Sequence, residues 1–250
     1  MTKIANTYYS KAHPKVLSLD GARVAKQIIA CFKNVDPSIN LKSATLLDVG
    51  SSNGAITHYI ADFVKNADGI DTDKPAIDDG HIRYLRKNLQ LNIFDGRNIP
   101  YPNSSFDLII FRRTYGSAQY PQKLTDEIFR VLKDEGLVYF EGHNKLFAWE
   151  SDYKIPFLTL FAPSLVKNLV KLLGHKNYYI GRYKTYWELK KLFHGFQIFN
   201  LTPKIIKNPK NFKFTNLYKL NIITNFIPLF ILKLLEPLLF PDFIWVLKKG

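Results

Sequence analysis

Short apolar runs alternate with helix-like patterns along residues 44–144 of this 250-residue chain, and this alternation most constrains its fold. The runs are the length of buried parallel strands and cover residues 44–50, a segment that ends at Asp71, and residues 89–94, 106–111 and 137–141. Residues 54–65, 75–87 and 124–132 lie between them with helical spacing or polarity. Strands joined by crossover helices predict an α/β fold.

The flanking segments predict one domain with additions. Residues 1–40 form an N-terminal helical cap with a helix at 21–33, residues 41–144 the core, and residues 145–184 a lid or insertion in which the alternation is lost. Residues 185–250 complete the sheet. There, the capping-box spacing of Thr185 and Glu188 opens a helix, and we expect a strand at 196–201, a loop at 203–216, a helix at 218–235 and a last strand at 243–247.

A glycine-containing turn follows the first predicted strand. Asp48, Gly50, Ser51, Ser52, Asn53 and Gly54 join this strand to a helix, so backbone N–H groups reach the carboxyl edge of the sheet, where ligands bind in open α/β folds. The turn reads GSSNGA and does not match the G-x-G-x-x-G fingerprint of nicotinamide dehydrogenases.

Acids end the next two predicted strands. Asp71 lies 21 positions after Gly50, close to the ~20-residue offset at which an acid accepts hydrogen bonds from ribose hydroxyls. Asp95 ends the third strand. We therefore expect Asp48, Asp71 and Asp95 to lie along one rim, although strand ends also favour Asp in ordinary turns.

As a set, these segments resemble the successive motifs of class I S-adenosylmethionine-dependent methyltransferases of the small-molecule type. The resemblance covers about residues 40–145 and rests on LLDVGSSNG, GIDTD, NIFDGRNIPYPNSSFDLIIF and EIFRVLKDEGLVYFEGHN. It implies a Rossmann-like, seven-stranded sheet with helices on both faces and a helical lid. It also implies an enzyme whose cofactor is S-adenosylmethionine.

The resemblance further implies roles for individual residues. The loop from Asp48 to Gly54 would hold the methionine part of the cofactor, Asp71 with Thr72 the ribose, and Asp95 with the Gly96 amide the adenine. Arg112 would face the cofactor or the acceptor. Ser52 departs from the family's richest motif, which has a glycine at this position.

His143, just after the fifth predicted strand, is a candidate general base, and a structural role for it stays open. The other histidines show no metal-ligand spacing, and we expect no metal. Cys31 lies in the predicted N-terminal helix, which disfavours the cysteine nucleophile of pyrimidine carbon-5 methylation. The absence of the motif used for amino-directed DNA methylation favours an oxygen acceptor.

Charge is distributed unevenly along the chain. Of the net charge of +14, residues 1–150 contribute 19 basic against 17 acidic side chains and residues 151–250 contribute 16 against 4. Such a basic part favours an anionic partner, although a solvated face would look the same. Apolar residues beside these lysines predict a lid and a second apolar face: Phe157, Leu158, Leu160, Phe161, Leu165 and Val166, then Ile222, Ile223, Phe226, Leu229, Phe230 and Leu234.

Three classes of function stay open at this point. The lid favours a small or lipid-like acceptor, with peripheral contact to an anionic membrane surface, unless its apolar residues are internal core. An RNA methyltransferase would use the same lysines on phosphates. The third class is a cofactor-binding protein without catalysis. With one cysteine, no signal peptide and no bilayer-spanning run, we expect a cytoplasmic protein.

Overall fold

The computed structural model describes residues 20–147, 155, 161, 163–172, 181–214, 217, 224 and 226–250. Residues 1–19 of the predicted cap and much of the predicted lid, including Phe157, Leu158 and Leu160, lie outside the described residues, as do Ile222 and Ile223. No helix within the described ranges is long and apolar enough to cross a membrane.

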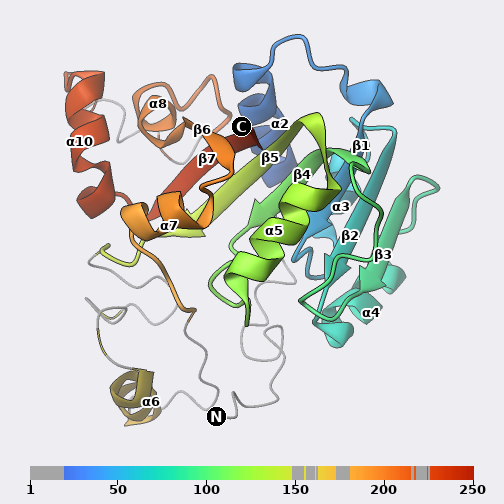
Figure 1. The fold of residues 1–250 in the computed structure, drawn as a ribbon, viewed down its shortest axis with the longest axis horizontal. Helices are drawn as coiled ribbons and strands as arrows, with labels where there is room; N and C mark the ends of the chain where they lie inside the picture. The colour runs from blue at the N-terminus through green and yellow to red at the C-terminus, as the bar shows by residue number, and fades with distance from the viewer. Residues whose placement is uncertain are drawn as a thin grey trace.

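A seven-stranded sheet in the order β3-β2-β1-β4-β5-β7-β6 organises the molecule (Figure 1). The pairs among β1 to β5 are parallel, and β7 runs antiparallel between β5 and β6. The strands are β1 (Thr45–Val49), β2 (Asn66–Asp71), β3 (Leu89–Ile93), β4 (Phe106–Arg112), β5 (Leu132–His143), β6 (Phe196–Asn200) and β7 (Asp242–Lys249). The predicted α/β, Rossmann-like sheet is confirmed.

Helices cover both faces of this sheet (Figure 1). One apolar cluster packs α2 and α3 on one face of the sheet, and a second packs α5 and α7 on the other face. Successive strand residues point to opposite faces, so Leu46 belongs to the first cluster and Leu47 to the second. The helical segments are α2 (Gly21–Val35), the 3-10 turn η2 (Leu41–Ser43), α3 (Ala55–Ile60), α4 (Lys74–Arg83), α5 (Pro121–Val131), α6 (Pro163–Leu172), α7 (Tyr186–Leu192), α8 (Thr202–Lys207) and α10 (Leu229–Leu239).

The capping box predicted for α7 is present. The Glu188 amide donates to the Thr185 hydroxyl at 3.3 Å, and the Thr185 amide donates to the Glu188 carboxylate at 2.7 Å. These reciprocal bonds satisfy two N–H groups that the first turn of a helix leaves unpaired.

Two predictions for the C-terminal part are wrong. The expected loop at 203–216 begins with a helix, α8, because Pro203 occupies its first turn, where no N–H is needed, and Ile205 and Ile206 are buried. The helix expected at 218–235 does not run through Pro228, because the ψ of this residue, 144°, is extended rather than helical. The observed helix, α10, begins after Pro228 and continues to Leu239.

Most described members of the predicted apolar faces are exposed rather than turned inward. Val166 is buried, whereas Phe161, Leu165, Phe226, Phe230 and Leu234 are exposed. The alternative that these five side chains belong to an internal core is therefore wrong.

Candidate functional site

The turn after β1 is held at the carboxyl edge of the sheet by main-chain bonds. The amides of Gly50 and Ser51 both donate to the Ile70 carbonyl of β2, at 2.8 and 3.1 Å. Gly50, Ser52 and Gly54 have φ values of 82°, 53° and 77°. A Cβ on Gly50 would lie 2.0 Å from the Thr114 hydroxyl, so only glycine fits there.

Ser51 places an unpaired hydroxyl in this turn. Its Oγ is buried and has no hydrogen-bond partner among the residues that the structure describes. A buried polar group without a partner is costly, and a polar ligand is one way to satisfy it. The hydroxyl packs against β2, where a Cβ on Gly69 would lie 2.8 Å from it.

Asp71 ties the turn to the end of β2. Its Oδ2 accepts from the Ser52 amide at 2.7 Å and its Oδ1 accepts from the Asp73 amide at 2.8 Å. Burial raises the pKa of Asp71, while these amide bonds act to lower it. Because a carboxylate offers about four lone-pair sites, Asp71 keeps capacity for ligand hydroxyl groups.

Asp48 lies beneath the turn rather than on its rim. It is 2% exposed, and the Thr57 hydroxyl of α3 donates to its Oδ2 at 2.7 Å. Burial raises the pKa of Asp48 to about 7, and the charge of Asp71 adds to this effect. The expected row of three carboxylates is therefore not a single exposed rim, because Asp48 lies one pair below the strand end, opposite Gly69.

Asn53 also faces the protein rather than an open site. It is 1% exposed, its Nδ2 donates to Asp79 of α4 at 2.9 Å, and its Oδ1 accepts from the Ala55 amide at 3.3 Å. These bonds fix the loop between two helices. They give Asn53 a positioning role in the turn.

The ends of β2 and β3 meet at Thr72 and Gly96. A Cβ on Gly96, whose φ is 74°, would lie 3.1 Å from Thr72 Cγ2. Asp95 is exposed, and its Oδ1 accepts from the amides of Arg97 and Asn98 at 2.7 and 2.8 Å. These amide bonds lower the pKa of Asp95, so it stays ionised in its own turn.

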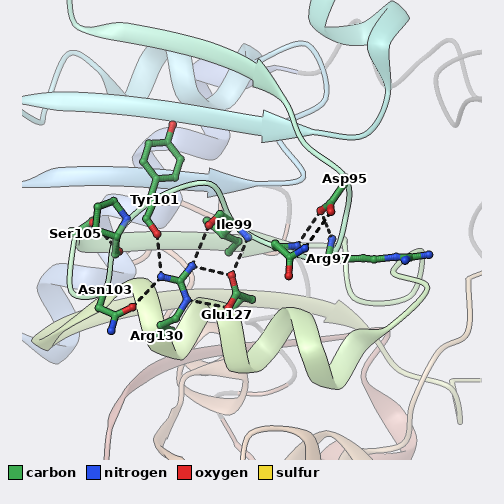
Figure 2. Close-up of polar contacts among 10 residues, drawn as sticks. Asp95, Arg97, Ile99, Tyr101, Asn103, Ser105, Glu127 and Arg130 are labelled. Atoms are coloured by element: carbon green, nitrogen blue, oxygen red, sulfur yellow. Dashed lines mark hydrogen bonds and ion pairs between the residues drawn. The ribbon is translucent and has the colours of Figure 1, made fainter.

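The chain that follows, residues 94–105, is fastened to α5 by Arg130 (Figure 2). The guanidinium donates to the carbonyls of Ile99 and Tyr101, each at 2.9 Å, and Glu127 accepts from the Ile99 amide at 2.8 Å. No motif in the sequence points to Arg130 or Glu127 as site residues. Their i, i+3 spacing on a helix was visible, but their loop partners were not.

A second cluster of charged groups occupies the ends of β4, β5 and the start of β7. Glu141 accepts from Arg112 Nε and Arg113 Nε, both at 2.8 Å, and Arg113 Nη2 bonds Asp242 at 3.1 Å. Burial would raise the pKa of Glu141, but the charges of the two arginines hold it below its usual value. The Nε of Arg112 is thus directed to Glu141, and the structure records no contact between it and the turn.

His143 belongs to this second cluster. Its Nδ1 lies 2.6 Å from Asp242 Oδ1, and the Tyr183 ring meets the imidazole edge-on at 5.0 Å between centroids. The side chain is 19% exposed. Asp242 was not predicted, because it precedes a strand far along the chain and no spacing links it to His143.

Strand register relates the two clusters. Asp48 pairs with Ile110, and Arg112 pairs with Glu141, so Gly50, Arg112 and Glu141 are at one level of three adjacent strands. Neighbouring strands lie ~4.8 Å apart, which places the second cluster about 10 Å across the sheet from the turn. The same edge therefore carries a polar turn and, beside it, a histidine–carboxylate pair. Within the described ranges, no group of three or more His, Cys, Asp or Glu side chains is arranged to hold a metal.

Comparison with known proteins identifies the domain type. Residues 47–140 match the family model of a methyltransferase domain. The chain is 26% identical over 125 residues to an rRNA adenine N-6-methyltransferase of Bacteroides fragilis, covering 49% of this chain and 43% of that protein. It is also 26% identical over 155 residues to a phthiotriol/phenolphthiotriol dimycocerosates methyltransferase of Mycobacterium leprae, covering 59% and 57%.

Solved structures show the same fold. An S-adenosylmethionine-dependent methyltransferase from Mesorhizobium loti superposes with a TM-score of 0.56 over 88% of this chain and 98% of that one, at 14% identity. The matches to the two curated relatives span less than two thirds of either protein's length. The predicted methyltransferase domain is confirmed for residues 47–140.

Proposed function

Because residues 47–140 match the model of a methyltransferase domain, we propose that the chain is a class I S-adenosylmethionine-dependent methyltransferase and that it transfers a methyl group to a small or lipid-like acceptor, at oxygen. The observation that carries this proposal is the turn after β1 and its bond to Asp71. There, the glycine turn and a carboxylate with spare acceptor capacity lie at the ends of the adjacent strands β1 and β2.

The cofactor's parts would be held by different segments. Gly50, Ser51 and Gly54 would contact its methionine part, supported by Asp48, Ser52 and Asn53. Asp71 with Thr72 would bind the ribose hydroxyls, and Asp95 with Gly96 would lie beside the adenine. When bound, S-adenosylmethionine supplies a methyl group activated by its sulfonium. The protein's contribution is then to orient the acceptor in line and to accept its proton.

His143 is proposed as the group that accepts this proton. Asp242 Oδ1 lies 2.6 Å from Nδ1, and this carboxylate would orient the ring and leave Nε2 for an acceptor hydroxyl. Arg112 and Arg113 pair with Glu141 and Asp242, so the charges of this cluster balance and the arginines hold the carboxylates in place beside His143. Asp242 orients the histidine and would not touch the acceptor.

A lipid-like acceptor is supported by one relative. The Mycobacterium leprae protein is named for methylation of phthiotriol and phenolphthiotriol dimycocerosates. It matches a stretch of 155 residues, longer than the stretch matched by the rRNA methyltransferase. Such an acceptor would bring the enzyme to the periphery of a membrane from a cytoplasmic location.

RNA methylation is the second candidate function. It is favoured by the similarity to the Bacteroides fragilis rRNA adenine N-6-methyltransferase and by the 16 basic side chains of residues 151–250. Binding to RNA that falls steeply with salt, together with label transfer to RNA, would establish it.

Two measurements test the proposal. Calorimetry with S-adenosylmethionine is expected to show binding that Asp71→Ala weakens by at least about tenfold, because a carboxylate hydrogen bond contributes ~1.5–3 kcal/mol. Lys74→Ala, an exposed change just beyond the same strand end, is the control and should leave affinity unchanged. Incubation of labelled cofactor with fractionated extract then asks whether lipid, RNA or protein is methylated. No uptake of the cofactor would refute the proposal, and uptake without transfer to any fraction would leave a non-catalytic binding protein.

A further inference from the structure

Helix α10 has the reverse of the usual polarity of a surface helix. Its inward residues include Glu236, which is 1% exposed, whereas Phe230 and Leu234 are 70% and 75% exposed. With Leu238 near the end of the helix, Phe230 and Leu234 repeat every four residues and form one apolar ridge. Each of these three side chains is more than half exposed.

Specific bonds hold α10 in this orientation. Asn200 of β6 donates to the Glu236 carboxylate at 2.5 Å. Asn144, the residue after His143, donates to the carbonyls of Pro237 and Phe240, each at 2.9 Å. Leu232 packs into a small apolar cluster with Ile206 of α8. If α10 rotated to turn its ridge inward, the side-chain N–H groups of Asn144 and Asn200 would lose these acceptors, which is costly for buried polar groups.

Basic side chains surround the ridge. Residues 201–240 contain six lysines and a single acid, Glu236, which is buried. Lys233 is exposed within α10, and Lys204 is exposed on α8, which lies beside α10 at the edge of the molecule (Figure 1). An apolar ridge with lysines around it matches the interfacial region of an anionic bilayer, where acyl chains lie beneath charged headgroups.

We propose that α10 docks the protein on the surface of an anionic membrane, with the ridge among the headgroups and Lys204 and Lys233 on their phosphates. This inference rests on the lipid-like acceptor of the proposed function. A second copy of this chain fits less well, because the lysines of two identical faces would repel each other. Helix α10 ends three residues before Asp242, so docking would bring the bilayer next to the His143 pair.

Vesicle sedimentation tests the docking. The full chain is mixed with phosphatidylcholine vesicles, with and without phosphatidylglycerol, at low and high salt. The wild-type protein is expected to pellet only with the anionic vesicles, and less at high salt. Phe230→Ser combined with Leu234→Ser is expected to weaken this binding by at least about tenfold, since each large apolar side chain contributes ~1.5–3 kcal/mol when fully buried.

A matched control removes equal apolar exposure elsewhere. Ile82 and Leu85 are each 81% exposed near the end of α4. The double variant Ile82→Ser, Leu85→Ser should bind vesicles like the wild type. Equal loss in both double variants would overturn the docking. So would failure of the wild type to pellet, or a wild-type dimer in light scattering that the Phe230→Ser, Leu234→Ser variant converts to monomer.

A second readout keeps the docking separate from the methyltransferase proposal. S-adenosylmethionine affinity of the Phe230→Ser, Leu234→Ser variant should equal that of the wild type, which also shows that the variant is folded. Cofactor binding without vesicle binding would overturn only the docking. Vesicle binding without cofactor binding supports the docking and refutes the proposed reaction. Retention of RNA that depends on Phe230 and Leu234 would assign the ridge to RNA and overturn the membrane partner.

Discussion

Arg130 fastens the 94–105 loop to α5, and its removal tests whether that loop shapes the cofactor site. Besides the two carbonyls, its guanidinium donates to Asn103 Oδ1 at 2.9 Å and to both Glu127 oxygens at 2.8 and 2.7 Å. The substitution Arg130→Met keeps much of the aliphatic stem and removes all of these donors. Asp95 and Gly96 lie in the same loop, so the change should reach the adenine side of the site.

The magnitude follows from the partners that are left behind. The carbonyls of Ile99 and Tyr101 are the two part-buried acceptors among the loop partners, and each bond from a charged donor contributes about 1.5–3 kcal/mol. The Arg130 side chain is 31% exposed, so water compensates in part and the lower end applies. The pair with Glu127 adds less than about 1 kcal/mol. We expect the free energy of unfolding to fall by ~3 kcal/mol.

Urea unfolding followed by tryptophan fluorescence measures this change, and calorimetry measures the affinity for S-adenosylmethionine. Lys123→Met is the control, since Lys123 is exposed on the same helix and bonds no loop carbonyl in the described structure. Arg130→Met should lower both quantities, and Lys123→Met neither. A loss below about 1 kcal/mol with unchanged cofactor affinity would show that the loop keeps its shape without Arg130.

Substitutions at four further residues probe the turn and the histidine pair. The pKa of Asp48 is about 7 in the folded protein and ~3.9 in the unfolded chain, so between these pH values the native state binds more protons. The free energy of unfolding should therefore fall as pH rises from about 4 to about 7, by up to ~1.4 kcal/mol per pH unit. Asp48→Asn should flatten this fall in urea titrations at several pH values, and parallel curves for the variant and the wild type would contradict the assignment. At Ser52, φ is 53°, so Ser52→Val should unfold about 1–2 kcal/mol more easily than Ser52→Gly, and equal midpoints would show that the left-handed conformation is not required. His143→Gln should lower kcat by ~10²-fold or more at unchanged cofactor affinity. Asp242→Asn should lower kcat less and shift the pH dependence of kcat. Full activity of the His143→Gln variant would show that His143 is not the base.

Much of the fold could be predicted from the sequence because it depends on local patterns. The run covering 106–111 became β4 because apolar residues that must be buried on both faces have few other solutions. The failures occurred where one residue type serves two purposes. Pro203 lies in the first turn of α8 although residues 203–216 are expected to form a loop, and Pro228 precedes α10 although it falls inside the helix expected at 218–235.

The site divides in the same way. The turn and Asp71 are contiguous or at a known offset in the sequence, so their proximity could be predicted, and the Ser52 amide bond to Asp71 realises it. Arg130 and Asp242 were not singled out, because hydrogen bonds to backbone carbonyls and ion pairs across strands leave no spacing in the sequence.

A parallel α/β sheet, a polar glycine turn at its carboxyl edge and an excess of positive charge near the C-terminus follow from the order of residues along the chain. Only the folded structure shows that Asp48 is buried beneath the turn, that His143 pairs with Asp242, and that α10 exposes Phe230 and Leu234. Periodicity fixes which residues share a helix or strand face. Only the packing of segments distant in the chain fixes which face meets water, a charge or another side chain.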